Sequence, residues 1–230
     1  MKEKSIYVGY DPKEKIAYDV CKHSIESISD LKVNRLYTKD IPEYDRDWGE
    51  PQSTDFTFSR FWVPYLNDFK GYSVYCDSDF LFLKNPISLL NAYNISKYAV
   101  MVVKHPPYIP KGELKMEGIP QHRMYRKNWA SLIVFNNSHS ACKQLTPDYL
   151  NNHRPGYEFH TLNWCRDSEI GAITINWNTL AGYYYLDEQD IGAIHYTDGG
   201  PWHSDYTDCE YAGLWRLEHA KLVQKNEKKG

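Results

Sequence analysis

The sequence predicts an α/β fold, because a strand, a helix and a second strand follow one another at the start of the chain. Residues 5–10 form a β-branched and aromatic run that stops at Asp11-Pro12, as a buried strand does. Over residues 13–29, apolar side chains recur every three or four positions, which indicates an amphipathic helix. Residues 31–37 are a second short apolar run. This order is typical of a parallel sheet with helices on its faces.

The rest of the chain continues the alternation. An aromatic-rich segment, residues 58–66, predicts a helix that Pro64 bends or ends. Further apolar segments and strands are expected at 71–76, 80–83, 98–104, 132–135, 173–175 and 193–196, and further helices at 87–93, 140–151, in part of 157–170, and at 210–226. Residues 105–127 carry four prolines and two glycines, and predict a long loop of the kind that often serves as a lid. With 230 residues, no internal repeat and no second boundary, a single domain over 1–230 is expected.

Composition excludes several classes of protein. The net charge of −3, from 27 basic and 30 acidic residues, lacks the basic excess of a nucleic-acid binder. Mean hydropathy is −0.66 and no apolar run approaches the length of a membrane span. The start of the chain has no apolar signal core, so no targeting peptide is expected there, and the scattered cysteines are expected to be reduced thiols in a cytoplasm. Five scattered cysteines without C-x-x-C spacing argue against a disulfide framework or a structural zinc site.

Two carboxylates, Asp77 and Asp79, directly follow the strand expected at 71–76. In α/β sheets, ligands bind beyond the carboxyl ends of strands. Two like charges this close repel, and a hard divalent cation with oxygen ligands would neutralise them. A solvated turn is the alternative interpretation, since D-x-D is common by chance.

A second candidate segment runs from His195 to Trp202, after the strand expected at 193–196. Gly199 and Gly200 would let main-chain N–H groups approach a diphosphate closely, and Trp202 could form a wall. A lone histidine is more often a plain core or surface residue. Together with the two carboxylates, however, His195 makes a set that suits Mn²⁺, which accepts imidazole more readily than Mg²⁺ does.

Two further segments have both a binding and a structural interpretation. After Tyr10, Asp11 could accept a hydrogen bond from a base or a ribose. It also fits a helix cap, with Pro12 next and Glu14 completing a capping box. Arg60 could clamp a phosphate or carboxylate through its planar fork, or it could be a surface residue of its helix.

These segments, in this order, resemble the nucleotide-sugar glycosyltransferases of the GT-A fold, especially the retaining family 8 group that includes glycogenin and bacterial galactosyltransferases. D-x-D alone is a weak signal, and the specificity lies in the combination. The matching segments are YVGYD (7–11), SRF (59–61) with Pro64, VYCDSD (74–79) with its sequel FLFLKNP (80–86), NWASLIVFN (128–136), WN (177–178) and HYTDGGPW (195–202).

The resemblance implies a Rossmann-like GT-A domain with a mixed, mostly parallel central sheet flanked by helices. Residues 1–104 would be the nucleotide-binding half and 105–230 the acceptor-side half with the metal-ligating histidine. A sugar would pass, with retention, from a nucleotide-diphosphate donor, expected to be a UDP-sugar, to a glycan, lipid or protein. The implied metal ligands for Mn²⁺ or Mg²⁺ are Asp77, Asp79 and His195; the donor contacts are Tyr10, Asp11, Arg60, Asp77, Ser78, Gly199, Gly200 and Trp202; and the catalytic candidates are Asp167 and Asn178.

The sequence departs from the family pattern at two places. Gly200 stands where the family usually has a lysine that contacts phosphate. Residues 166–169 replace an Asp-Gln-Asp segment, which leaves Asp167 as a candidate only. The lysine-rich end, residues 221–229, fits a solvated tail or a peripheral contact with an anionic membrane.

Three other functions remain open at this level. A phosphohydrolase or phosphotransferase could use Asp77 as nucleophile, although such enzymes usually continue with Gly or Thr where Phe80 and Leu81 follow here. The departures also fit a non-catalytic nucleotide-sugar binder. An interaction module would use the 20 tyrosines and 7 tryptophans, which can pack a core or line a sugar site.

Overall fold

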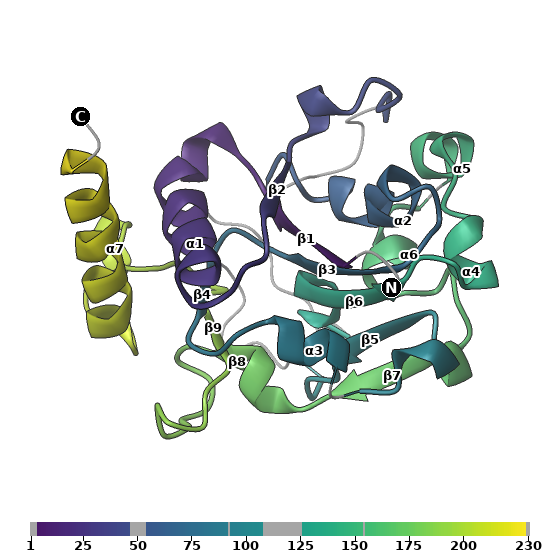
Figure 1. The fold of residues 1–230 in the computed structure, drawn as a ribbon. Helices are drawn as coiled ribbons and strands as arrows, with labels where there is room; N and C mark the ends of the chain where they lie inside the picture. Colours follow the sequence, from purple (N-terminus) through teal and green to yellow (C-terminus); the bar gives the residue numbers. More distant parts are fainter. Residues whose placement is uncertain (1–3, 47–53, 92, 108–125, 154, 229–230) are drawn as a thin grey trace.

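The computed structural model describes residues 4–46, 54–91, 93–107, 126–153 and 155–228. Most of the segment expected to act as a lid, residues 108–125, lies outside the described residues. The described chain forms a central sheet with helices on both faces, and a smaller sheet beside it (Figure 1). The α/β class is therefore confirmed.

The central sheet has six strands in the order β2-β1-β3-β6-β5-β7. Neighbouring strands are parallel in three pairs, β2/β1, β1/β3 and β5/β7, and antiparallel where β6 pairs with β3 and β5. The sheet is mixed and mostly parallel, as expected. Its strands are β1 (Lys4–Gly9), β2 (Val33–Leu36), β3 (Tyr72–Cys76), β5 (Val100–Val103), β6 (Leu132–Asn136) and β7 (Ile170–Ile173).

Successive side chains along the strands of the central sheet point to opposite faces and pack into two separate hydrophobic cores. Tyr75 packs on one face with Trp62, whereas its neighbours Val74 and Cys76 pack on the opposite face. Helices α2, α4, α5 and α6 cover the first face, and α1 and α3 cover the second (Figure 1). The helices are α1 (Lys15–Ile28), α2 (Val63–Leu66), α3 (Ile87–Asn91), α4 (Ser140–Lys143), α5 (Pro147–Asn152), α6 (Tyr157–His160) and α7 (Ala212–Glu227).

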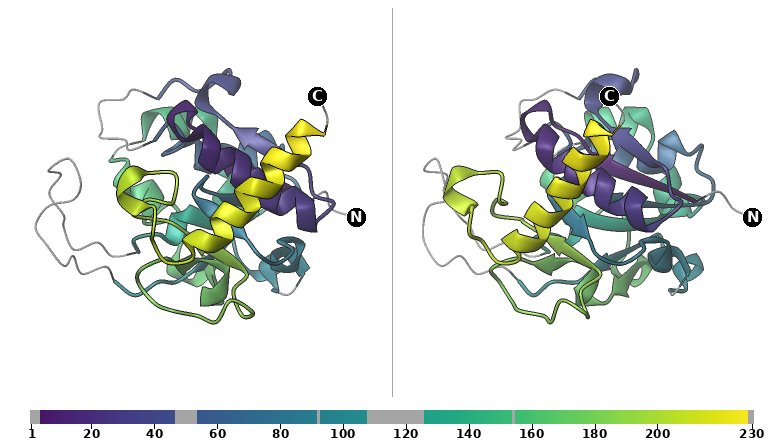
Figure 2. Two further views of the ribbon diagram at one scale, coloured as in Figure 1. Left: turned by 90° about the vertical axis from the view of Figure 1, so that its left-hand side faces the viewer. Right: turned by 60° about the vertical axis from the view of Figure 1, so that its left-hand side comes forward.

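A three-stranded sheet, ordered β4-β9-β8, lies beside the central one. It consists of β4 (Phe80–Phe82), β8 (Thr179–Leu180) and β9 (Ala193–His195). A third core joins this sheet to α1 and α7 through Val20, Ile194 and Trp215. Helix α7 packs across α1 (Figure 2). The strand expected at 193–196 thus belongs to the smaller sheet.

Two local predictions are wrong. The helix expected at 140–151 is two helices, because Thr146 caps a new one, accepting a hydrogen bond from the N–H of Tyr149, with Pro147 in its first turn. The strand expected at 173–175 lies earlier, at Ile170–Ile173, and residues 175–177 form a 3₁₀ turn. Within the described residues, none of the helices has the length and apolarity that crossing a bilayer would require. All five cysteines are free thiols, which agrees with the absence of a disulfide framework.

Candidate metal and donor site

Two pairs of strands bring the candidate residues together. The N–H of Asp77 donates to the carbonyl of Ser131 at 3.0 Å, so the β3/β6 ladder extends to the first carboxylate. The chain then turns into β4, whose register against β9 places Phe80 opposite His195. In the next pair, the N–H of Tyr196 donates to the carbonyl of Asp79 at 3.0 Å. Strand pairing therefore fixes both carboxylates and the imidazole at one edge.

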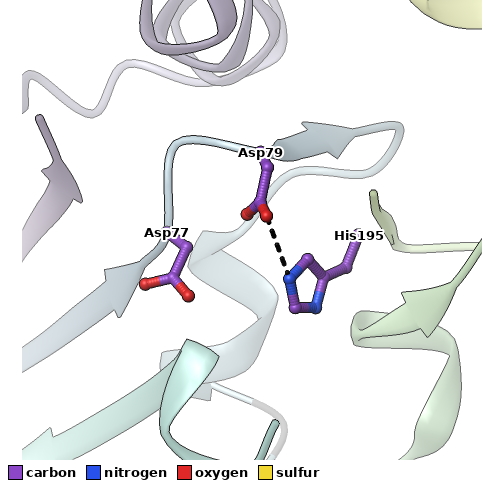
Figure 3. A group of neighbouring side chains, drawn as sticks. All are labelled: Asp77, Asp79 and His195. Carbon is purple, nitrogen blue, oxygen red and sulfur yellow. Dashed lines mark ion pairs between the residues drawn. The ribbon is translucent and has the colours of Figure 1, made fainter. Parts of the chain in front are cut away.

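Asp77, Asp79 and His195 form one cluster, and each offers a ligand atom within 4.8 Å of the other two. Figure 3 shows the two carboxylates and the imidazole converging. Nε2 of His195 lies 3.3 Å from Oδ2 of Asp79, whose Oδ1 is buried and has no hydrogen-bond partner. A buried carboxylate oxygen without a partner is costly unless a cation meets it. Two carboxylates and an imidazole fit a divalent ion such as Mn²⁺.

Asp77 is held by two neighbours on the same face of the sheet. The hydroxyl of Tyr75 donates to Oδ1 at 2.5 Å, and Nη2 of Arg60 lies 3.0 Å from the same oxygen. Burial raises the pKa of Asp77 to about 6; Arg60 opposes the rise and Asp79 adds to it. Burial also raises the pKa of Tyr75 well above its usual value, so its hydroxyl keeps the proton that it donates.

Arg60 is a buried residue rather than a surface one, with 7% of its area exposed. Its Nη1 donates to the carbonyl of Ala130 at 2.8 Å and to Oδ2 of Asp77 at 3.3 Å, and its Nε donates to the carbonyl of Thr57 at 3.1 Å. The carboxylate that the guanidinium clamps belongs to the protein itself. A donor contact through Arg60 therefore stays a prediction that this geometry does not favour.

His195 is fixed from two sides. Its ring stacks on Phe80, with centroids 4.4 Å apart and planes at 16°, and its Nδ1 lies 2.9 Å from Oδ1 of Asn178. Asn178 is fully buried. It lies behind the imidazole: its side chain contacts His195, Asn128 and Ser131, and its backbone carbonyl accepts from the hydroxyl of Tyr184. The catalytic role expected of Asn178 is untested, and the position favours a supporting one.

Tyr10 and Asp11 directly follow β1, at the same edge as Asp77 because β1 and β3 are parallel. Asp11 accepts from the N–H of Lys13 at 2.9 Å and from the N–H of Asp55 at 3.0 Å, so it caps the turn before α1. Both of its oxygens are used inside the protein. The ring of Tyr10 packs edge-on against Tyr37, with centroids 5.2 Å apart.

The capping box expected with Glu14 is wrong, because that carboxylate reaches across to the segment after β9. Its Oε2 accepts from Nε1 of Trp202 at 2.5 Å, and its Oε1 lies 3.2 Å from Nε2 of His203. Gly200 packs directly against the Trp202 ring, whereas Gly199 has a φ of +134°, where side chains are disfavoured. The two glycines shape the turn that follows His195.

The two remaining candidates, Ser78 and Asp167, lie at different distances from the cluster: Ser78 is within its turn and Asp167 is outside it. Ser78 is buried in the turn between the two carboxylates. Asp167 precedes β7, which runs parallel to β3 and starts at the opposite edge of the sheet. Its side chain is 82% exposed and pairs with Nη2 of Arg126 at 2.6 Å. The described contacts do not join Asp167 to the cluster, and its catalytic role stays a prediction.

Sequence reasoning missed the residues that support the cluster. Tyr75 had a usable signal, since it lies two residues before Asp77 and so on the same face of its strand. Ser131, Tyr184 and His105 had none. Tyr184 bridges Nδ1 of His105, at 2.8 Å, and the backbone carbonyl of Asn178, at 3.0 Å. Burial lowers the pKa of His105 to about 3, so that ring is neutral.

No family model matches the sequence. The chain is 39% identical over 232 residues to protein CDI of Arabidopsis thaliana, with 97% of this chain and 88% of that protein covered. The chain belongs to the protein CDI family. Nearly the whole length of the two proteins is shared.

Solved structures similar to this CDI family member include glycosyltransferases. The bifunctional glycosyltransferase WbbM has a TM-score of 0.66 at 14% identity, covering 95% of this chain and 50% of its own. GlyE of Streptococcus pneumoniae has 0.60 at 14%, covering 100% and 64%. An active-site mutant of LgtC has 0.60 at 13%, covering 95% and 96%. The chain thus spans half of WbbM and about two thirds of GlyE. At such identities the likeness shows the fold alone, and the expected GT-A fold is confirmed.

Proposed function

We propose that this protein is a metal-dependent glycosyltransferase that transfers a sugar from a nucleotide-diphosphate donor, a UDP-sugar, to a glycan, lipid or protein. The observation that carries the proposal is the meeting of Asp77, Asp79 and His195 at the carboxyl edge of the sheet of a GT-A fold. The unpartnered Oδ1 of Asp79 supports a cation there. LgtC, a galactosyltransferase of the same fold, has been solved with donor and acceptor sugar analogues.

The chain's own residues would act as ligands and as an electrostatic frame. Asp77, Asp79 and His195 would hold Mn²⁺, or Mg²⁺, against the donor diphosphate. When bound, such an ion supplies Lewis-acid stabilisation of the charge that builds on the leaving phosphate. Tyr75 and Arg60 hold the carboxylate of Asp77 in place before any ligand arrives. Preorganisation of this kind is usually the largest contribution to catalysis.

Residues 1–104 would bind the nucleotide. Tyr10 and Tyr37 lie at the carboxyl ends of neighbouring strands β1 and β2, and the guanidinium of Arg35 lies 5.0 Å from the centre of the Tyr10 ring. Flat aromatic faces and a guanidinium suit a nucleobase. The N–H groups near Gly199 and Gly200 would approach the diphosphate, where relatives of family 8 use a lysine. Residues 105–230 would then form the acceptor side.

Retention and the family 8 assignment are part of the proposal. A covalent intermediate needs a carboxylate free to attack, and Asp77 is instead held by Arg60 and Tyr75. The acceptor would therefore attack from the face that the leaving group departs from. The same contacts weigh against a phosphohydrolase with Asp77 as nucleophile.

A thermal-shift screen of nucleotide sugars, each with Mn²⁺ and with EDTA, tests the proposal. A ligand that binds only the folded state raises the apparent stability. We expect at least one UDP-sugar to stabilise the protein in the presence of Mn²⁺ but not of EDTA. Asp79→Asn should abolish that shift. Asp208→Asn is the matched control, since Asp208 is 92% exposed and outside the cluster.

Turnover assays on the same proteins separate the alternatives. Sugar transfer, or slow hydrolysis of the donor, supports the glycosyltransferase. Hydrolysis of phosphomonoesters without use of any nucleotide sugar would support the phosphohydrolase instead. Mn²⁺-dependent binding without turnover across a broad acceptor panel would indicate a binder. If no nucleotide sugar bound under any metal condition, the proposal would be wrong.

A further inference from the structure

The amide of Asn178 has one orientation that its neighbours allow. Its Nδ2 donates to Oγ of Ser131 at 3.0 Å and lies 3.4 Å from the backbone carbonyl of Asn128. A carbonyl can only accept hydrogen bonds, so the nitrogen of the amide must face it. The amide oxygen is then the atom that faces Nδ1 of His195, at 2.9 Å.

That orientation requires hydrogen on Nδ1 of His195. An amide oxygen can only accept, so Nδ1 must donate to it. Oγ of Ser131, 3.4 Å from Nδ1, does not compete as a donor, because its own hydrogen points to the carbonyl of Asn128 at 2.7 Å. Every described group facing Nδ1 is therefore an acceptor. The other nitrogen, Nε2, faces Asp79 in the cluster.

We infer that Asn178 is a positioning residue: it holds His195 with hydrogen on Nδ1, so that Nε2 presents its lone pair to the cation. The inference rests on the proposed metal-dependent function for its purpose, although the orientation of the amide does not. In other metal sites, the partner of the second imidazole nitrogen sets the tautomer and the ring direction, and losing it typically weakens metal binding 10- to 100-fold.

The supporting network is buried and hydrogen-bonded. Asn178 and Ser131 are almost completely buried, and the hydroxyl of Tyr184 donates to the backbone carbonyl of Asn178 at 3.0 Å. Asn128 has a φ of +64°, a left-handed conformation that directs its carbonyl at both side chains. A non-glycine residue keeps such a conformation only where the surrounding contacts hold it in place. Here it orients the acceptor that fixes the amide.

Three variants separate positioning from simple packing. Asn178→Leu removes the acceptor for Nδ1 and should weaken Mn²⁺ binding 10- to 100-fold, measured by electron paramagnetic resonance with Mn²⁺ alone and with UDP. Asn178→Asp keeps an acceptor for Nδ1, so it should recover most of the affinity while lowering the thermal midpoint, because it loses the donation to Asn128. Asn137→Leu is the control: Asn137 is also fully buried and donates to a serine hydroxyl and a carbonyl, at the opposite end of β6. It should destabilise the fold without changing Mn²⁺ affinity.

A second measurement needs no metal. Long-range ¹H–¹⁵N correlation spectra of the metal-free wild-type protein should show His195 protonated on Nδ1. In folded Asn178→Leu, hydrogen should also appear on Nε2 of the neutral ring. A wild-type neutral ring protonated only on Nε2, or an Asn178→Leu variant with wild-type Mn²⁺ affinity, would overturn the inference. If the wild-type protein bound no Mn²⁺ with or without UDP, the proposed metal site would fail, and the spectra would still decide the role of Asn178.

Discussion

Arg60 and Asp77 form a buried ion pair at the base of the cluster, with Nη2 of the arginine 3.0 Å from Oδ1 of the aspartate. Their side chains are 9% and 12% exposed. Such a pair is costly to break, because the remaining charge stays buried without its counterion. Arg60 thus keeps one carboxylate of the cluster ionisable in an environment that disfavours its charge.

Arg60→Met should therefore destabilise the protein by about 3–5 kcal/mol, the usual cost of removing one partner of a buried pair. Urea unfolding in the absence of metal measures it. Arg35→Met is the control, since Arg35 pairs with Asp40 at the surface, with 47% and 45% of the two side chains exposed. It should cost less than about 1 kcal/mol. Equal losses in the two variants would contradict the buried pair.

Gly200→Ala should destabilise the segment after β9. An added Cβ would lie 1.9 Å from the nearest ring carbon of Trp202, so the ring would have to leave its hydrogen bond with Glu14. A loss of about 1–3 kcal/mol is expected for such overpacking. Gly213→Ala, in the first turn of α7 with nothing within 4 Å of the added carbon, should be neutral or stabilising in the same urea experiment. Wild-type stability of Gly200→Ala would show that the Trp202 ring is not held there.

His105 should make the fold sensitive to acid. Burial lowers its pKa from 6.5 to about 3, so below pH 6.5 the unfolded state binds a proton that the folded state does not. Stability contributed by this group is present above pH 6.5 and is lost as the pH falls toward 3. By linkage the loss at pH 5 is about 2 kcal/mol. His105→Gln should therefore lose less stability than wild type between pH 7 and pH 5 in metal-free urea titrations; parallel pH profiles would contradict the burial of a neutral ring.

Asp79→Ala should lower turnover at least about a hundredfold, given the usual loss when a stabiliser of developing charge is removed. The fold should survive, because the side chain of Asp79 is 26% exposed and its Oδ1 has no partner to lose. Initial rates with the stabilising UDP-sugar, across a Mn²⁺ titration, measure the effect. Wild-type turnover with unchanged metal dependence would rule out this site.

Local patterns were sufficient for much of the fold and for the two carboxylates of the cluster, whereas His195 was assigned to the cluster by combining distant segments and by the family resemblance. The first strand-helix-strand unit, β3 and the following carboxylates were all visible in apolar periodicity and turn residues. Asp77 and Asp79 are two residues apart in the sequence, so their proximity needed no tertiary information. The signal for two helices, Thr146 before Pro147, was present in the sequence.

Tertiary contacts decided what the sequence could not. The partner of Arg60 lies 17 residues away on another element. The sequence around Arg60 therefore cannot show whether its guanidinium binds a carboxylate of the protein or a phosphate of a ligand. The roles of Glu14 and Asn178 depend on partners 188 and 17 residues away. For Asp11, the sequence predicted the helix cap but not the hydrogen bond that its other carboxylate oxygen accepts from the N–H of Asp55.

The location of a bound cation tests the central claim most directly. Crystals grown with Mn²⁺ and UDP should show an anomalous manganese peak between the side chains of Asp77, Asp79 and His195, with the diphosphate in contact with it. A manganese peak elsewhere, or a diphosphate bound away from these three side chains, would contradict the proposed function.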